Sequence, residues 1–304
     1  MCNLEKNISR LRRPTGMVDV VLDTDTYNEI DDQFALAYLL KSDDKLTTKA
    51  IYAAPFFNSH SVSPKDGMEK SYGEILNILE LMDRRELTSS VYRGSETYLT
   101  NEETPVISPA AQDLARRAME YSSEKPLYVV AIGAITNVAS ALLLQPEISE
   151  KIVVVWLGGN ALHWTDNKEF NLMQDVAAAR VIFGCGVPLV QLPCMGVVSA
   201  FATCGPELEF HLKGKNALSD YLVKNTTDEA LRCGGGKTWS RIIWDVTAVG
   251  WLLGDDLMSA RLEHTPVPEY DHRYAENPQG IFYQYVYHIH RDRLFADLFE
   301  KLTK

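Results

Sequence analysis

Hydrophobic positions along the chain follow two alternating spacings. Continuous apolar runs predict buried strands over residues 17–22, 50–54, 127–132, 152–157 and 187–192. Apolar residues at helical spacing predict helices from residue 31 onward and over 65–82, 106–121, 136–144, 175–183 and 240–253. Because strands that alternate with helices build parallel sheets, the pattern predicts an α/β fold with an open, mainly parallel wound sheet flanked by helices.

The same pattern contains no internal repeat and no clear boundary, so we expect residues 1–304 to form one domain. Residues 1–16 are expected to form an N-terminal arm, in which the basic cluster Arg10, Arg12 and Arg13 is solvated. Residues 196–239 and 264–280 are richer in Gly, Pro and loop signals, and we expect them to form loop or helical cap regions.

The charge and the hydrophobic runs of the chain exclude two classes of partner, nucleic acids and membranes. Lys and Arg number 30 against 41 Asp and Glu, which gives a formal net charge of −11. Nucleic-acid binding depends on clustered cations, so we expect no nucleic-acid partner. No apolar run approaches the roughly 20 residues of a membrane span, and the first residues lack the apolar core of a signal peptide. We therefore expect no membrane association.

Cysteine usage indicates a reducing compartment. The five cysteines are odd in number and widely spaced, and no CxxC pair suggests a zinc site. Free thiols are typical of the cytoplasm, which is the location that we predict. Cys185 and Cys194 flank the predicted strand at 187–192, and we expect both to be small core residues.

Residues 20–34, VVLDTDTYNEIDDQF, crowd four aspartates together: Asp23, Asp25, Asp31 and Asp32. The first two follow a predicted strand and the last two begin a helix, and ligands of open α/β sheets bind beyond the carboxyl ends of strands. Two unit charges about 4 Å apart repel by roughly 1 kcal/mol in water and about 4 kcal/mol at an effective dielectric of 20. We interpret the cluster as a metal or catalytic site, because a cation or proton uptake would relieve the repulsion.

Other polar residues occupy equivalent places in the predicted fold. Thr136 and Asn137 follow the strand at 127–132, and Gly158-Gly159 ends the strand at 152–157, with Glu169-Phe170-Asn171 soon after. Asp245 is predicted inside the helix at 240–253, between Trp244 and Val246, where burial without a partner would be costly.

Taken together, these segments resemble the inosine-uridine-type nucleoside hydrolase family over about residues 18–250. The matching pieces, in the same order, are DTD at 23–25, DD at 31–32 followed by QFALA, GAITN at 133–137, VVVWLGG at 153–159, HWTDNKEFN at 163–171, and Asp245. The resemblance implies a nucleoside hydrolase-like fold with a Rossmann-like core. It also implies a homodimer or homotetramer that hydrolyses the N-glycosidic bond of a ribonucleoside and releases free base and ribose for purine or pyrimidine salvage.

The resemblance further implies a bound Ca²⁺, a hard cation that takes six to eight oxygen ligands. Its implied ligands are Asp25, Asp32, the backbone carbonyl of Thr136, and Asp245. Asp25 would also act as the general base that deprotonates the attacking water. The implied substrate-binding residues are Asp31 at a ribose hydroxyl, Glu169 and Asn171 at the 5′ end of the sugar, and Asn58 at the sugar, with Asp23 supporting the site from behind.

The chain departs from the family pattern at two catalytic positions. Five residues, TYNEI, separate Asp25 from Asp31, whereas better-studied members have a shorter turn there. We expect this loop to bulge outward and to leave the metal site intact. Many members carry a His where this chain has Trp244, which can stack on a leaving base but cannot protonate it. His163 and His60 are the candidates for a displaced acid.

The leaving-group side is less defined by the sequence. Residues 53–72, which lie where the base would bind, differ from the family's usual Gly-Asn turn. The resemblance therefore does not indicate which nucleobase the substrate carries. Tyr27, Phe56, Phe57 and Trp164 are candidates for an aromatic pocket, with core packing an equal alternative for Phe56 and Phe57.

Three other functions compete with nucleoside hydrolysis. A haloacid-dehalogenase-type phosphatase also begins with an apolar strand and DxD, but it requires Thr where this chain has Tyr27. A calcium-dependent ribose- or nucleoside-binding protein without hydrolysis would account for Trp244 and the longer loop, although such a binder has no need of Asp25 as a base. The third is a hydrolase of a related ribosyl compound, such as a nicotinamide or modified-base riboside.

Overall fold

The computed structural model of the protein describes residues 8–234, 236 and 238–304. Part of the predicted N-terminal arm, including Cys2, and two positions of the predicted cap region therefore lie outside the described residues. The strands are β1 (Val18–Thr24), β2 (Leu46–Ala53), β3 (Val91–Arg93), β4 (Leu127–Ala131), β5 (Ile152–Leu157), β6 (Leu189–Leu192), β7 (Ala202–Cys204), β8 (Ser240–Ile242), β9 (Met258–His264), β10 (Val267–Pro268), β11 (Tyr274–Ala275) and β12 (Phe282–Ile289). The helices are α2 (Asp31–Leu40), α3 (Pro64–Leu81), α4 (Pro109–Arg117), α5 (Thr136–Leu144), α6 (Phe170–Gln174), α7 (Val176–Gly184), α8 (Gly205–Leu212), α9 (Ala217–Arg232), α10 (Val246–Trp251) and α11 (Arg291–Thr303).

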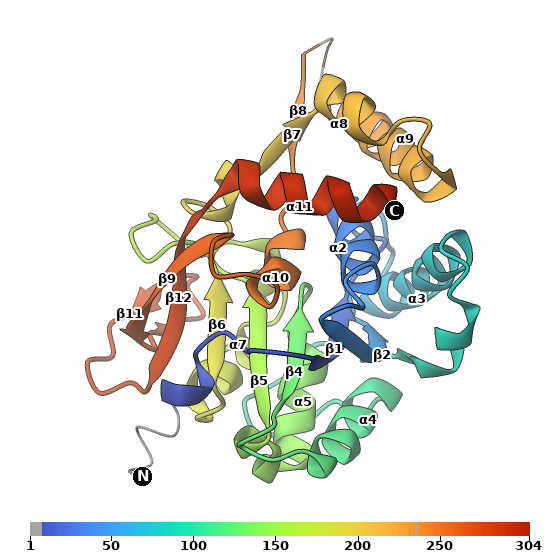
Figure 1. The fold of residues 1–304 in the computed structure, drawn as a ribbon. Coiled ribbons are helices and arrows are strands. Elements are labelled where there is room, and N and C mark those ends of the chain that lie inside the picture. The colour runs from blue at the N-terminus through green and yellow to red at the C-terminus, as the bar shows by residue number, and fades with distance from the viewer. Residues whose placement is uncertain (1–7, 235, 237) are drawn as a thin grey trace.

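The centre of the fold is an eight-stranded sheet with the order β3-β2-β1-β4-β5-β6-β12-β9 (Figure 1). Every neighbouring pair is parallel except β12 and β9, which pair antiparallel at one edge. The first six strands have the doubly wound order, in which the direction of winding reverses between β1 and β4. The predicted α/β fold with a mainly parallel wound sheet is therefore confirmed.

Side chains of the central strands are buried on both faces of the sheet, which explains their continuous apolar runs. In β1, Val20 and Leu22 pack in one hydrophobic cluster with α2, α3, α10 and α11. Val21 points the other way and packs with α4, α5 and α7. Figure 1 shows helices on both sides of the sheet. These helices cover the two faces of the sheet and not the carboxyl ends of its strands, where ligands of such folds bind.

The predicted helix over 240–253 is wrong in its first half. Ser240–Ile242 forms β8, which pairs antiparallel with β7, and the helix α10 begins only at Val246. Asp245 therefore lies at the N-terminal boundary of a helix instead of inside one. Its side chain makes no capping hydrogen bond, which leaves the carboxylate available to the site.

Two regions contain more regular structure than the sequence pattern predicts. Residues 196–239 include β7 and the helices α8 and α9, which lie together at one end of the molecule (Figure 1). The C-terminal segment adds β9, β12 and α11, which are not among the predicted elements. Among the described residues, no helix combines the length and the apolar character that a membrane span requires.

The basic cluster near the N-terminus is not a solvated arm. The Arg10 guanidinium is buried and donates hydrogen bonds to the carbonyls of Ser149 and Ile152, both at 2.9 Å. Arg13 donates to the carbonyl of Met258 at 2.6 Å and stacks on Trp251, 4.0 Å from the ring centroid. Only Arg12 of the three is exposed, so the prediction is wrong for Arg10 and Arg13.

Replacing Arg10 with Ala is expected to lower the free energy of unfolding by about 2–3 kcal/mol, because one buried and one partly buried carbonyl lose a charged donor. Arg12→Ala is the matched control, with an expected change within about 0.5 kcal/mol for an exposed residue. Urea unfolding followed by circular dichroism measures both. Equal midpoints for the two variants would contradict the structural role of Arg10.

The cysteine prediction holds for only one of the two core candidates. Cys194 is buried, whereas Cys185, which caps the C-terminal end of α7, is exposed. The four described cysteines, Cys185, Cys194, Cys204 and Cys233, are free thiols.

Candidate active site

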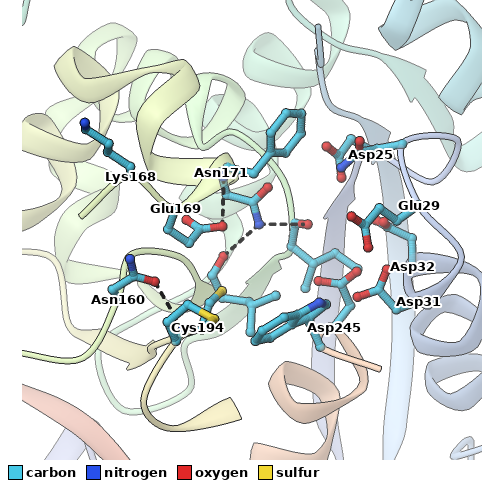
Figure 2. Close-up of a pocket in the computed structure, with 16 residues that line it drawn as sticks. Asp25, Glu29, Asp31, Asp32, Asn160, Lys168, Glu169, Asn171, Cys194 and Asp245 are labelled. Atoms are coloured by element: carbon cyan, nitrogen blue, oxygen red, sulfur yellow. Dashed lines mark hydrogen bonds between the residues drawn. The ribbon is translucent and has the colours of Figure 1, made fainter. Parts of the chain in front are cut away.

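A cavity of about 230 Å³ opens at the carboxyl ends of the central strands. Asp25 directly follows β1, Ile132 directly follows β4, and Leu157 ends β5. Figure 2 shows carboxylates gathered on one side of this cavity and the segment around Glu169 on the other. The lining residues are Asp25, Asn28, Glu29, Asp31, Asp32, Ile132, Leu157, Asn160, Lys168, Glu169, Phe170, Asn171, Cys194, Met195, Trp244 and Asp245.

Three carboxylates on one wall meet closely enough to share a cation. Oxygens of Asp31, Asp32 and Asp245 all lie within 4.8 Å of one another, and all three residues are buried. Asp31 and Asp32 begin α2, and Asp245 precedes α10, a helix that packs directly on α2. The packing of the two helices thus brings together two of the predicted ligands, Asp32 and Asp245, with Asp31, while the predicted ligand Asp25 is not part of this close group.

Asp25 adds a fourth carboxylate to this wall. Its side chain is 1% exposed, and neither carboxylate oxygen has a hydrogen-bond partner among the described residues. Burial, followed by the charges of Asp32 and Asp31, raises the pKa of Asp25 well above its ordinary value. An ionised carboxylate in this position requires a compensating positive charge.

The donor set fits a hard metal ion. Asp25, Asp31, Asp32 and Asp245 offer only carboxylate oxygens, which suit calcium, magnesium or manganese and not the softer metals that prefer sulfur. Burial raises the pKa of Asp32 to about 7, and it raises the pKa of Asp245 together with the charge of Asp31. A divalent cation would reverse both shifts by favouring the ionised forms.

A second layer of hydrogen bonds fixes the acidic wall from behind. Asp23 is fully buried outside the cavity and accepts a hydrogen bond from the Asn137 amide at 2.8 Å. The Asn137 amide oxygen in turn accepts from the backbone N–H of Ser95 at 2.7 Å. The Thr24 hydroxyl donates to Asp32. Asp23 therefore lies where a supporting residue is expected.

On the opposite wall, Glu169 is held by three backbone N–H groups. They belong to Gly159, Asn171 and Leu172, at 2.8, 2.9 and 2.9 Å. Gly159 adopts φ +74°, and a Cβ there would approach the Tyr274 hydroxyl to 2.1 Å, so this turn requires glycine. The Asn171 amide donates to the Leu157 carbonyl at 3.1 Å. The two predicted residues for the 5′ end of the sugar thus share one rigid wall.

The longer loop between Asp25 and Asp31 does not bulge outward as a whole. Tyr27 is 45% exposed, but Asn28 is only 7% exposed, and Asn28 and Glu29 both line the cavity. The backbone N–H of Asn28 donates to the Asp25 carbonyl at 2.7 Å, and its amide oxygen accepts from Asn58 at 2.5 Å. These bonds fold the loop back over the site, which corrects the sequence-based expectation.

Several other predicted residues are not among those that line the cavity. Thr136 is buried at the start of α5 and donates its hydroxyl to Asp175 at 2.6 Å, so carbonyl ligation by Thr136 stays a prediction. Asn58 contacts Asn28 but does not line the cavity. His163 is exposed and lies outside the lining. Trp244 does line it, as a stacking residue would.

A neighbouring cavity of about 420 Å³ receives the other candidates for the leaving-group side. His60 and Tyr27 line this second cavity, which shares Asn28 and Glu29 with the first. Phe56 is fully buried in the core, while Phe57 and Trp164 are 53% and 41% exposed and line neither cavity. The predicted aromatic pocket is therefore not formed as expected.

The cavity has four further polar lining residues that are not among the predicted ones: Asn28, Glu29, Asn160 and Lys168. Asn160 follows Gly158-Gly159 directly and accepts a hydrogen bond from the Met195 backbone N–H at 3.1 Å. Its place just after a strand end was the available signal. Lys168 is adjacent to Glu169, and Figure 2 places it on the wall opposite Glu29.

The sequence matches a known protein family. A family model described as inosine-uridine preferring nucleoside hydrolase matches residues 20–277. A pyrimidine-specific ribonucleoside hydrolase, RihB of Escherichia coli (strain K12 / DH10B), is 26% identical over 213 residues, which cover 60% of this chain and 66% of that relative. The matched region thus spans just under two thirds of this relative's length.

Solved structures share the fold. The plant nucleoside hydrolase PpNRh1 superposes with a TM-score of 0.76 at 20% identity, over 94% of this chain and 99% of that chain. A purine-preferring ribonucleoside hydrolase from Gardnerella vaginalis gives a TM-score of 0.74 at 20% identity, over 94% and 98%. At this level of identity the likeness concerns the arrangement of the sheet and its helices.

Proposed function

Since the chain belongs to the inosine-uridine preferring nucleoside hydrolase family, we propose that it hydrolyses the N-glycosidic bond of a ribonucleoside with the help of calcium. The observation that carries the proposal is Asp25, a buried carboxylate without a hydrogen-bond partner, in the same cavity as Asp31, Asp32 and Asp245. Family members that act on pyrimidine or purine nucleosides, as the names of the relatives state, support this reaction class.

The groups proposed to hold calcium are the side chains of Asp25, Asp32 and Asp245 and the backbone carbonyl of Thr136. When bound, the ion would neutralise the carboxylates and polarise a water molecule and the ribose diol. Asp25 would take the proton of the attacking water, because its oxygens have no competing partner among the described residues. Asp31 would accept a hydrogen bond from a ribose hydroxyl.

The opposite wall would fix the other end of the sugar. Three backbone N–H groups hold the Glu169 carboxylate in place, and this carboxylate would accept a hydrogen bond from the 5′ hydroxyl. Asn171 lies beside it, and Asn58 acts through its bond to Asn28. Gripping both ends places C1′ against the water, and such positioning can supply several kcal/mol of barrier reduction. Direct attack by water would invert the anomeric carbon.

The experiment is release of ribose from a panel of ribonucleosides, measured by a reducing-sugar assay with calcium and after chelation. We expect calcium-dependent release from at least one nucleoside. Saturable ribose binding without turnover of any of them would favour the binding-protein alternative instead. Hydrolysis of a generic phosphomonoester that depends on magnesium would favour the phosphatase alternative.

We also propose, by extension from the family, that the protein works in the cytoplasm as a homodimer or homotetramer. Light scattering coupled to size-exclusion chromatography measures the oligomeric state directly, and a monomer would contradict this part of the proposal.

A further inference from the structure

The loop that connects Asp25 to Asp31 forms the boundary between the two cavities. Asn28 and Glu29 line both of them, so a substrate whose sugar occupies the first cavity would extend past these two residues. Bonds to Asp25 and Asn58 hold the backbone and side chain of Asn28, and the exposed Glu29 follows it in the loop. Figure 2 shows the Glu29 carboxylate on the same side as Asp31 and Asp32.

Both cavities carry an excess of negative charge around this boundary. The first is lined by six carboxylates, namely Asp25, Glu29, Asp31, Asp32, Glu169 and Asp245, against the single cation Lys168. A bound divalent ion would leave the lining net negative. The second is lined by Glu29, Glu74, Asp228 and Glu229 against Arg232, with which Glu229 pairs at 2.7 Å. Lys168 lies on the far wall from Glu29 (Figure 2).

The lining of the first cavity offers no ordinary acid for a departing base. It contains no His or Tyr among the residues that the structure describes. Trp244 has an indole N–H, which does not ionise as an acid near neutral pH. Burial, followed by the charge of Glu169, raises the pKa of the Cys194 thiol well above its usual value, so this group keeps its proton. In the first cavity a neutral nucleobase would therefore find no His or Tyr to protonate it, and His60 lines only the second cavity.

We propose that the preferred substrate is a riboside whose aglycone is already a cation at the glycosidic ring system, with Glu29 as a specificity-determining residue that faces this charge. The inference rests on the proposed hydrolase function. The C1′–N bond breaks and its electron pair passes to the aglycone, which becomes neutral. The water oxygen bonds to C1′, and the proton that it loses to Asp25 is later released to solvent. The products are ribose, a neutral aglycone and one proton, so no acid is consumed.

Two contacts in the site suit such an aglycone. The carboxylate of Glu29 attracts a positive ring by Coulomb forces. The indole of Trp244, which lines the same cavity, can bind a cation on its face more strongly than a neutral ring. The same acidic lining disfavours an aglycone that carries phosphate or carboxylate groups.

The test uses guanosine and 7-methylguanosine, which differ by one methyl group and one positive charge. The intrinsic reactivity of each substrate cancels when the variant is compared with the wild type on that same substrate. For Glu29→Gln we expect kcat/KM to fall about tenfold with 7-methylguanosine and by less than about twofold with guanosine. Glu103→Gln, an exposed carboxylate that lines neither cavity, is the matched control and should change neither value.

Binding gives a readout that does not depend on turnover. The cation 1-methylnicotinamide should inhibit wild-type ribose release more strongly than neutral nicotinamide, and Glu29→Gln should weaken only the cation. An equal loss with both ribosides, or a larger loss with guanosine, would overturn the inference, because Glu29 would then be structural or an acid. Calcium-dependent turnover of guanosine with no preference for the cation would overturn it while the proposed function stands. Absence of turnover with every riboside would overturn both.

Discussion

Replacing Asp25 with Asn is expected to lower kcat for ribonucleoside hydrolysis by about 10³-fold, within the range of a lost general base. Asp25 is buried and both of its oxygens lack partners, so the amide that replaces it creates no broken hydrogen bond in the described structure. The amide oxygen can still approach a hard cation, but the amide cannot accept a proton from water at neutral pH. We therefore expect calcium binding to weaken less than catalysis.

The measurements are kcat by ribose release and the calcium Kd by isothermal titration calorimetry, on the same preparations. The control is Asp19→Asn on the same strand, because Asp19 lies at the far end of β1 and pairs with Lys49 at 3.3 Å. Asp19→Asn should leave kcat within about twofold of the wild type. A kcat of the Asp25→Asn variant that also lies within that range would eliminate Asp25 as the base.

The second large effect concerns stability. Burial raises the pKa of both Asp23 and Asp32 to about 7 in the metal-free protein. Above the unfolded-state pKa, near 4, the unfolded chain loses these protons while the folded protein keeps them until about pH 7. Stability therefore falls as pH rises between these values, by up to about 1.4 kcal/mol per pH unit for each carboxyl. We expect metal-free protein to lose about 2–5 kcal/mol between pH 5 and pH 7.

Calcium should remove most of this loss. At 100 times its Kd the ion adds about 2.7 kcal/mol to the free energy of unfolding. The gain should be larger at pH 7.5 than at pH 5, because protons compete with the metal for the carboxylates. Urea unfolding at both pH values, with calcium and with chelator, measures all four quantities. If the metal-free protein became more stable from pH 5 to pH 7, burial would not raise the pKa of Asp23 and Asp32 as stated above.

The local hydrophobic pattern is sufficient to predict the strand and the helix that carry Asp25, Asp31 and Asp32. The apolar run of β1 and the helical spacing after Asp31 fix where Asp25, Asp31 and Asp32 lie, because both elements are buried and bordered by charge. The place of Asp245 at the site was also predicted, but its setting inside a helix was wrong. β8 forms only because it pairs with β7, some 40 residues earlier in the chain, and such pairing leaves little trace in local periodicity.

The remaining differences also depend on partners distant in sequence. The direction of the loop is set by the bond between Asn28 and Asn58, and its sequence alone does not distinguish an inward from an outward path. The local sequence predicts Arg10 to be a solvated cation, because its partners, the carbonyls of Ser149 and Ile152, are distant in sequence. Glu169 shows the opposite case: Gly159 and Glu169 both belong to the segments on which the family resemblance rests, and the backbone N–H of Gly159 donates to the Glu169 carboxylate.

The attachment of the loop between Asp25 and Asp31 has a consequence for how such proteins diversify. Each of its ends is anchored in regular structure, at the close of β1 and at the first turn of α2. Adding two residues to a segment of this size costs only about 0.3 kcal/mol of chain entropy. Insertions in this loop can therefore persist without displacing the aspartates of the acidic wall. Each insertion presents new side chains to the leaving group of the substrate. A lineage could in this way exchange one leaving group for another while its water-activating chemistry stays the same.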